Sequence, residues 1–115
     1  MPIDSKAFEI HAEIVLHDLF EQIDDALGDV MDVDLEGGIL TIELAGGGLY
    51  VINKQAPNME IWVSSPLSGA LHFKFDEQQK SWIDTRAGGG LYDLLSREMA
   101  QASGQLFSLK ERESI

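Results

Sequence analysis

The sequence contains no cysteine. The chain therefore forms no disulfide and has no catalytic thiol, no cysteine-ligated iron–sulfur cluster and no cysteine-type zinc site. Proline is also scarce, with 3 residues in 115, and 44% of the residues are hydrophobic, which is typical of a folded globular protein rather than a disordered one. We expect a single domain spanning residues 1–115.

Long apolar runs are missing as well. No stretch approaches the ~20 apolar residues of a membrane span. The N-terminal segment carries Asp4, Glu9, Glu13 and Asp18, where a secretory signal would be basic and then apolar. We therefore expect no membrane association and a cytoplasmic location, with a mature mitochondrial protein as the less favoured alternative.

Basic residues are few. The chain has 8 Lys and Arg against 20 Asp and Glu, a formal net charge of −12. The excess is concentrated in residues 1–36, which hold 11 acids and a single Lys. Such a surface repels phosphate backbones, which argues against nucleic-acid binding, and it attracts cations and basic protein partners.

The segment from Ser5 to about Leu27 predicts a long helix. Asp4 and Ser5 are helix-capping residue types, and neither Pro nor Gly interrupts the segment. Apolar residues recur every three or four positions, as on one face of a helix. They are Phe8, Ala12, Val15, Leu19, Ile23 and Ala26. The last turns are acidic, although acids near a helix C-terminus oppose the helix dipole at ~0.3–1 kcal/mol each.

After Gly28 the acids alternate with apolar residues, as on a strand with one acidic face. The acids of both elements are Asp18, Glu21, Asp24 and Asp25 on the helix and Asp32, Asp34 and Glu36 on the strand. Two interpretations are open, a solvated face that aids solubility or a cation-attracting ridge, and we favour the ridge because its repulsions cost local stability. Carboxylates suit hard cations, including iron, and the absence of a closed-site motif predicts weak, exchangeable sites.

The remainder of the chain reads as strands followed by a helix. Short alternating segments lie at about 39–44, 49–53, 59–64, 70–75 and 81–83, which with 32–36 make about six strands. Their links are too short for parallel crossovers, so we expect an antiparallel sheet. A second helix is expected from about Leu91 to Ala102. The predicted fold class is α+β, a two-layer sandwich with both helices on one face of the sheet and the order αββββββα.

The sheet face without helices should meet solvent, and Trp62 falls on it together with Glu60 and Ser64. A tryptophan in that position is either shielded by neighbouring long side chains or serves as an anchor for a partner protein. Trp82 stands beside Ile83, and we expect it in the core.

Residues Tyr50–Gly69, YVINKQAPNMEIWVSSPLSG, resemble the signature region of the frataxin family. The resemblance covers nearly the whole chain, from Phe8 to the LYDLL run that opens the last helix. It implies two helices on an antiparallel sheet and weak binding of Fe²⁺ or Fe³⁺ on an acidic ridge. It also implies a role in iron–sulfur cluster biogenesis, with the cysteine desulfurase and the scaffold protein as partners.

The resemblance further implies roles for individual residues. The iron-binding ridge corresponds to Glu21, Asp24, Asp25, Asp29, Asp32 and Asp34, and with Asp18 from the helix spacing these form what we call the acidic ridge. The surface that contacts the assembly complex corresponds to Asn53, Lys54, Gln55 and Trp62. His72 departs from the pattern, because animal frataxins carry an arginine there. The tail should pack between the helices through Leu106 or Phe107, with the last few residues fraying.

Three hypotheses of different classes follow. The leading one is an iron-binding regulator or iron donor that acts by binding rather than turnover, as a monomer, with an iron-induced oligomer left open. A weak ferroxidase with an iron-storage role ranks lower, because the sequence has no closed di-iron cage of Glu and His. The third is an acidic adaptor that binds a basic protein without any metal.

Overall fold

The computed structural model describes residues 3–111, and its elements follow the predicted order. Helix α1 spans Ser5–Leu27 and helix α2 spans Leu91–Ser103. The strands are β1 (Met31–Glu36), β2 (Ile39–Leu44), β3 (Leu49–Gln55), β4 (Glu60–Ser65), β5 (Gly69–Asp76) and β6 (Ser81–Asp84). A short 3-10 turn, Ala56–Asn58, joins β3 to β4. The predicted fold class is confirmed.

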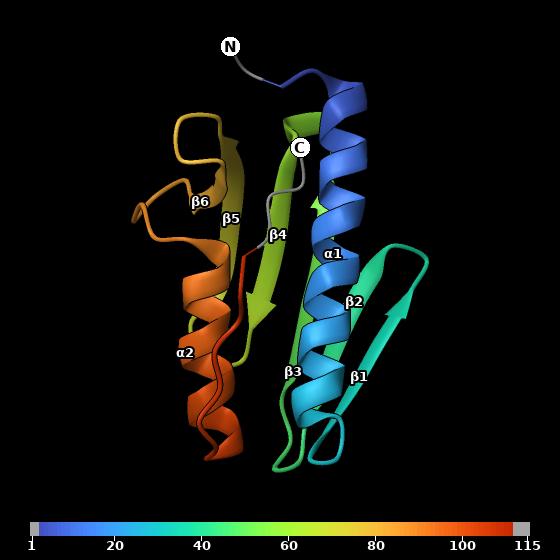
Figure 1. The fold of residues 1–115 in the computed structure, drawn as a ribbon, viewed down its shortest axis with the longest axis vertical. Coiled ribbons are helices and arrows are strands. Elements are labelled where there is room, and N and C mark those ends of the chain that lie inside the picture. Colours follow the sequence, from blue (N-terminus) through green and yellow to red (C-terminus); the bar gives the residue numbers. More distant parts are fainter. Residues whose placement is uncertain (1–2, 112–115) are drawn as a thin grey trace.

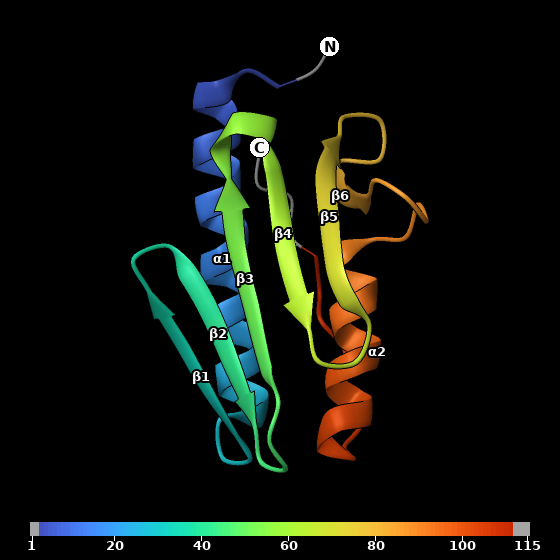
Figure 2. The ribbon, with the colours of Figure 1, turned by 180° about the vertical axis from the view of Figure 1, so that it is seen from behind.

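The six strands form one antiparallel sheet in sequence order, from β1 at one edge to β6 at the other. Both helices lie side by side on one face of this sheet (Figure 1). The opposite face carries no helix (Figure 2), and we call it the open face. Within residues 3–111, neither helix has the length and apolarity needed to cross a bilayer.

Helix α1 has well-defined ends. The Asp4 carboxylate accepts a hydrogen bond from the Ala7 N–H at 2.8 Å, which caps the first turn. At the other end a Cβ on Gly28 would lie 2.4 Å from the Asp24 carbonyl oxygen, so only glycine fits. The prediction that Ala26 faces the core was wrong. The structure exposes Ala26 and buries Leu27, because Leu27 follows the buried Ile23 by four residues and so lies on the same face.

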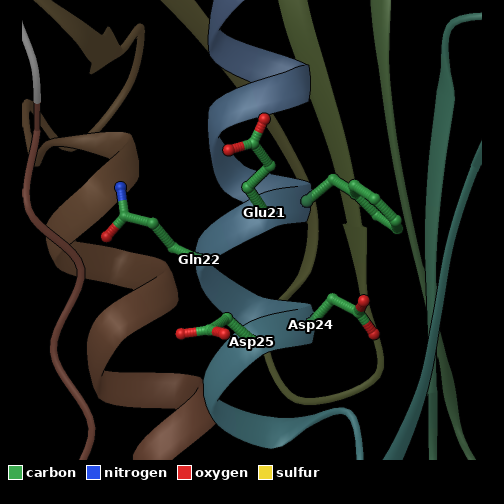
Figure 3. Close-up of a pocket in the computed structure, with 5 residues that line it drawn as sticks. Glu21, Gln22, Asp24 and Asp25 are labelled. Atoms are coloured by element: carbon green, nitrogen blue, oxygen red, sulfur yellow. The ribbon is translucent and has the colours of Figure 1, made fainter.

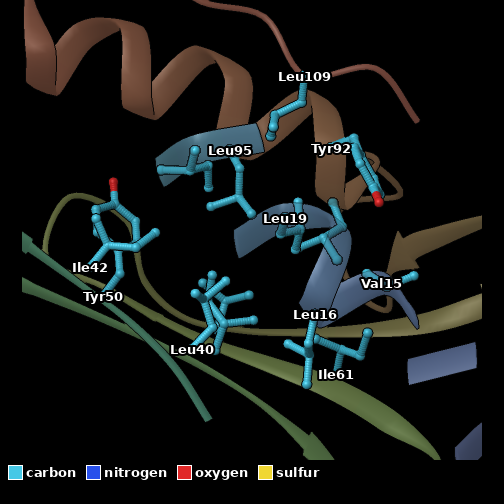
Figure 4. Close-up of a cluster of buried hydrophobic side chains, with 14 of the residues drawn as sticks. Val15, Leu16, Leu19, Leu40, Ile42, Tyr50, Ile61, Tyr92, Leu95 and Leu109 are labelled. Carbon is cyan, nitrogen blue, oxygen red and sulfur yellow. The ribbon is translucent and has the colours of Figure 1, made fainter. Parts of the chain in front are cut away.

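The core lies between the helices and the sheet (Figure 4). Leu16 and Leu19 of α1 pack there with Leu40 and Ile61 of the sheet, all at most 2% exposed. Trp82 is 1% exposed, which confirms its predicted core position. Its ring meets those of Phe8 and Phe75 edge-on, with centroids 5.8 Å and 5.6 Å away.

The C-terminal segment runs back between the two helices (Figure 1). The Gln22 side-chain amide donates to the Lys110 carbonyl at 2.8 Å and accepts from the Lys110 N–H at 2.9 Å. The neighbouring Leu109 is 8% exposed and fills the gap, while Phe107 packs only partly against the core. The prediction for Leu106 was wrong, since it is fully exposed on the far side of an extended chain. The predicted fraying lies outside the described residues.

Candidate metal and partner surfaces

The exposed part of the acidic ridge follows the last turns of α1 and continues along the edge strand β1. Consecutive residues on a helix project about 100° apart. Asp24 and Asp25 therefore diverge on the surface of α1, with Glu21 between them and Gln22 on the Asp25 side (Figure 3). These side chains line an open hollow on the helix surface together with Phe20. Carboxylates that diverge in this way do not enclose an ion.

One ridge carboxylate already has a partner. The Nδ1 atom of His17 lies 2.9 Å from the Glu21 carboxylate, four residues along the same helix. Both side chains are more than half exposed, so this contact is a surface pair that competes with solvent. A cation arriving at Glu21 meets a carboxylate that already has a neighbour, whereas among residues 3–111 no ion pair involves Asp24 or Asp25.

A second hollow lies where α1 gives way to β1, and its lining includes Asp29, Asp32 and Glu43. The sheet register places Asp32 directly opposite Glu43 on the neighbouring strand. Glu43 was not among the predicted site residues. The Gly37-Gly38 pair is the sequence signal that could have placed it. Both glycines adopt positive φ values, 59° and 77°, as a two-residue hairpin turn requires, and such a turn fixes the register of Asp32 against Glu43.

Asp18 lies apart from the rest of the ridge. Its carboxylate is buried between the helices, where it accepts hydrogen bonds from the Tyr92 hydroxyl at 2.7 Å and from the Gln22 amide at 3.0 Å. A charged hydrogen-bond acceptor of this kind joins α1 to α2. The spacing argument placed Asp18 with Glu21 and Asp25, but its burial against Tyr92 gives it a structural role, and we leave it out of the metal site proposed below.

Residues 3–111 form no preformed ligand cage. Within the part of the chain that the structure describes, no three Asp, Glu or His side chains come together in a geometry that holds a metal ion. The ridge therefore offers carboxylates singly or in pairs. Hard cations bound in this way keep most of their water ligands and exchange readily.

The residues predicted to bind a partner divide between two faces. Asn53, Gln55 and Trp62 lie on the open face, where the register pairs Asn53 with Trp62 and Trp62 with His72. The Trp62 ring stacks on His72 with centroids 4.4 Å apart and planes 11° apart. Its Nε1–H donates to the Glu60 carboxylate at 2.8 Å. Trp62 is thus both partly shielded and displayed, so the two interpretations of its position are compatible.

Lys54 projects from the same strand toward the helices. Its ammonium lies 2.6 Å from the carboxylates of both Glu9 and Glu13 of α1. The hydrogen bonds that Lys54 donates, first to Glu13 and then to Glu9, raise its pKa above the usual value. Alternation along β3 explains why the Lys54 side chain points toward the helices, because Lys54 follows the buried Ile52 by two residues. The Lys54 charge is therefore paired within the molecule and is not presented on the open face.

The frataxin-like domain family matches residues 1–105, which is most of the chain. The chain belongs to the frataxin family. The architecture agrees with this assignment, because two helices cover one face of a six-stranded antiparallel sheet.

Two sequence relatives agree with this assignment. The iron-sulfur cluster assembly protein CyaY of Thioalkalivibrio sulfidiphilus is 36% identical over 105 residues, covering 90% of this chain and 96% of the relative. The mitochondrial frataxin homologue of Schizosaccharomyces pombe is 37% identical over 102 residues, covering 88% of this chain and 65% of the relative.

Two solved frataxin structures are also similar. The frataxin of Psychromonas ingrahamii superposes with a TM-score of 0.82 at 25% identity, covering 95% of this chain and all of that one (100%). A trimeric frataxin from Saccharomyces cerevisiae, complexed with ferrous iron, superposes with a TM-score of 0.74 at 35% identity, covering 83% of this chain and 87% of that one.

Proposed function

We propose that this protein binds Fe²⁺ or Fe³⁺ weakly on its acidic ridge and regulates, or supplies iron to, the cysteine desulfurase and scaffold complex of iron–sulfur cluster biogenesis. The observation that carries the proposal is the second hollow, where Asp29, Asp32 and Glu43 line one open recess at the junction of α1 and β1. Membership of the frataxin family and the name of the CyaY relative support the assembly role.

Iron is cargo in this proposal, and the carboxylates suit it. Oxygen ligands favour hard cations, and a hydrated iron ion bridging one or two carboxylates is held loosely enough to be passed on. The proposed ligands are the exposed ridge acids and the newly found strand acid. They are Glu21, Asp24, Asp25, Asp29, Asp32, Asp34 and Glu43. Weak binding follows because no three of the described acids converge.

The same charge suits a basic protein partner. Acidic patches steer a protein toward a positive surface and raise the association rate. Asp34 on β1 and Trp62 on β4 both face the open side of the sheet, so charge and an aromatic anchor are available to one partner. We assign the docking surface to Asn53, Gln55 and Trp62, and we give Lys54 the intramolecular role described above.

Anaerobic titration with Fe²⁺, followed residue by residue by NMR, tests the metal assignment. We expect line broadening in the last turns of α1, in β1 and around Glu43. A variant carrying Asp29→Asn and Asp32→Asn should lose the broadening around the second hollow. A matched variant carrying Asp76→Asn and Asp84→Asn removes two charges from the other edge of the sheet, and the broadening should remain.

The outcomes separate the competing functions. Broadening that centres outside the ridge, or broadening around the second hollow that survives the Asp29 and Asp32 substitutions, would refute the ridge assignment. Iron-dependent oxygen consumption at catalytic ratios would favour a ferroxidase instead. Binding of the desulfurase complex with no iron-induced broadening at all would favour a metal-independent adaptor.

A further inference from the structure

Glu60 is a buried carboxylate on the otherwise open face of the sheet. It is 8% exposed, although no helix covers that face. The register places it between Gln55 and Lys74 on the flanking strands, and Trp62 follows it by two residues on the same face. Burying a carboxylate is costly unless it is hydrogen-bonded, so its partners indicate what it does.

One oxygen of Glu60 contacts both rings of the stacked pair. Its Oε1 atom accepts a hydrogen bond from the Trp62 Nε1–H at 2.8 Å and lies 3.7 Å from the Nδ1 atom of His72. The rings themselves are nearly parallel, with planes 11° apart. Rotation of the indole would break a hydrogen bond to a charged acceptor, which is stronger than one between neutral groups. Rotation of the imidazole would carry Nδ1 away from the same oxygen.

We infer that Glu60 is a positioning residue that holds Trp62 and His72 as one preordered stack of two rings, the platform, for the protein partner. The inference rests on the proposed function, because the platform lies within the docking surface assigned above. Ordering a flexible side chain upon binding costs about 2- to 10-fold in affinity, and a surface ordered beforehand avoids that loss. Glu60 already accepts from the indole N–H, and His72 covers one face of the indole, so Trp62 offers the partner the remainder of its apolar ring rather than a donor.

The test compares Glu60→Ala and Glu60→Gln with the wild-type chain. One measurement is the NMR signal of the Trp62 indole N–H and its exchange with water, with the buried Trp82 indole as an internal control. The other is affinity for the assembled desulfurase and scaffold complex, with Trp62→Ala marking complete loss of the platform. Asp93→Asn removes one charge from an exposed site on α2, away from the open face, and serves as the matched control.

We expect Glu60→Ala to shift the Trp62 indole signal, accelerate its exchange and lower affinity about tenfold. Glu60→Gln keeps a hydrogen-bond acceptor of the same shape, so its affinity should fall less than that of Glu60→Ala. It also provides the measurement if the alanine variant does not fold. Asp93→Asn should change neither reading.

An unchanged indole signal in Glu60→Ala would overturn the inference, as would a released indole with unchanged affinity. A wild-type chain that does not bind the complex would refute the proposed function instead. The indole measurement would still decide whether Glu60 orders the two rings.

Discussion

The facing carboxylates of Asp32 and Glu43 allow a direct test of whether the acidic ridge costs stability. The two residues are directly opposite in the β1–β2 register, and both are exposed. Like charges in that position are destabilising, whereas an opposite-charge pair contributes ~0.2–1 kcal/mol. Glu43→Lys converts one arrangement into the other. We therefore expect the free energy of unfolding to rise by about 1 kcal/mol.

Thermal unfolding followed by circular dichroism measures this change. For a domain of this size, about 1 kcal/mol corresponds to a rise in Tm of roughly 4 °C. The rise should shrink in concentrated salt, because the screening length falls from about 10 Å at 0.1 M to about 3 Å at 1 M. The same variant should lose iron-induced broadening around the second hollow, since an ammonium group replaces a ligand there.

Glu36→Lys is the matched control. It makes the same change in net charge on the same face, but its cross-strand neighbour is Ile39 rather than an acid. Its Tm should rise less than that of Glu43→Lys. Equal rises would show that net charge alone sets the effect, and no rise for Glu43→Lys would refute the argument that the ridge weakens the fold.

Two further predictions concern shifted pKa values. Glu13 and Glu9 raise the pKa of Lys54, so Lys54→Met should lower the free energy of unfolding by about 1 kcal/mol. In the wild type this stabilisation is fully present below pH 10.5, the ordinary pKa of lysine, and it is lost as pH rises through the higher pKa of Lys54 in the folded chain. Unfolding measured at increasing pH will show this loss. Burial, and then Lys80, lowers the pKa of His11 from 6.5, so protonation favours the unfolded chain and stability should fall as pH drops below that value. Urea unfolding of His11→Gln should show a shallower pH slope, and an identical slope would contradict the assignment.

Elements were predictable because local patterns determined them. The helix of residues 5–27 was readable from its caps and apolar spacing, and the strands from their alternation. An observed strand boundary differs from the predicted one where the backbone conformation of a single residue ends the strand. Strand β4 begins at Glu60 rather than Met59, because Met59 closes the 3-10 turn with a positive φ of 53°.

The acidic character of the ridge was readable from the sequence, but the burial of single residues depended on distant partners. Asp18 is buried because Tyr92, 74 residues away, supplies a hydroxyl. Leu109 rather than Leu106 fills the gap between the helices because Gln22 pairs with the backbone of Lys110, 88 residues away. No local pattern reports such a pairing.

Two residues could have been placed from the sequence with a stricter use of strand geometry. Alternation from Ile52 already puts Lys54 on the helix side of β3. The Gly37-Gly38 turn already puts Glu43 opposite Asp32. The resemblance to a family indicated which segment contacts a partner, and the strand period was needed to say which of its side chains face outward.

The fold tolerates the repulsion of the ridge because α1 is held at other points. Near its start, Lys54 of β3 bridges Glu9 and Glu13, and near its middle the Asp18 carboxylate joins it to α2. The uncompensated acids begin after these attachments, in the last turns and in the edge strand. Their repulsion is therefore local, and a cation that neutralises them stabilises the native state by mass action without repacking the core. Under the proposed function, a surface built in this way would gain and lose iron while the open face keeps its shape for a partner.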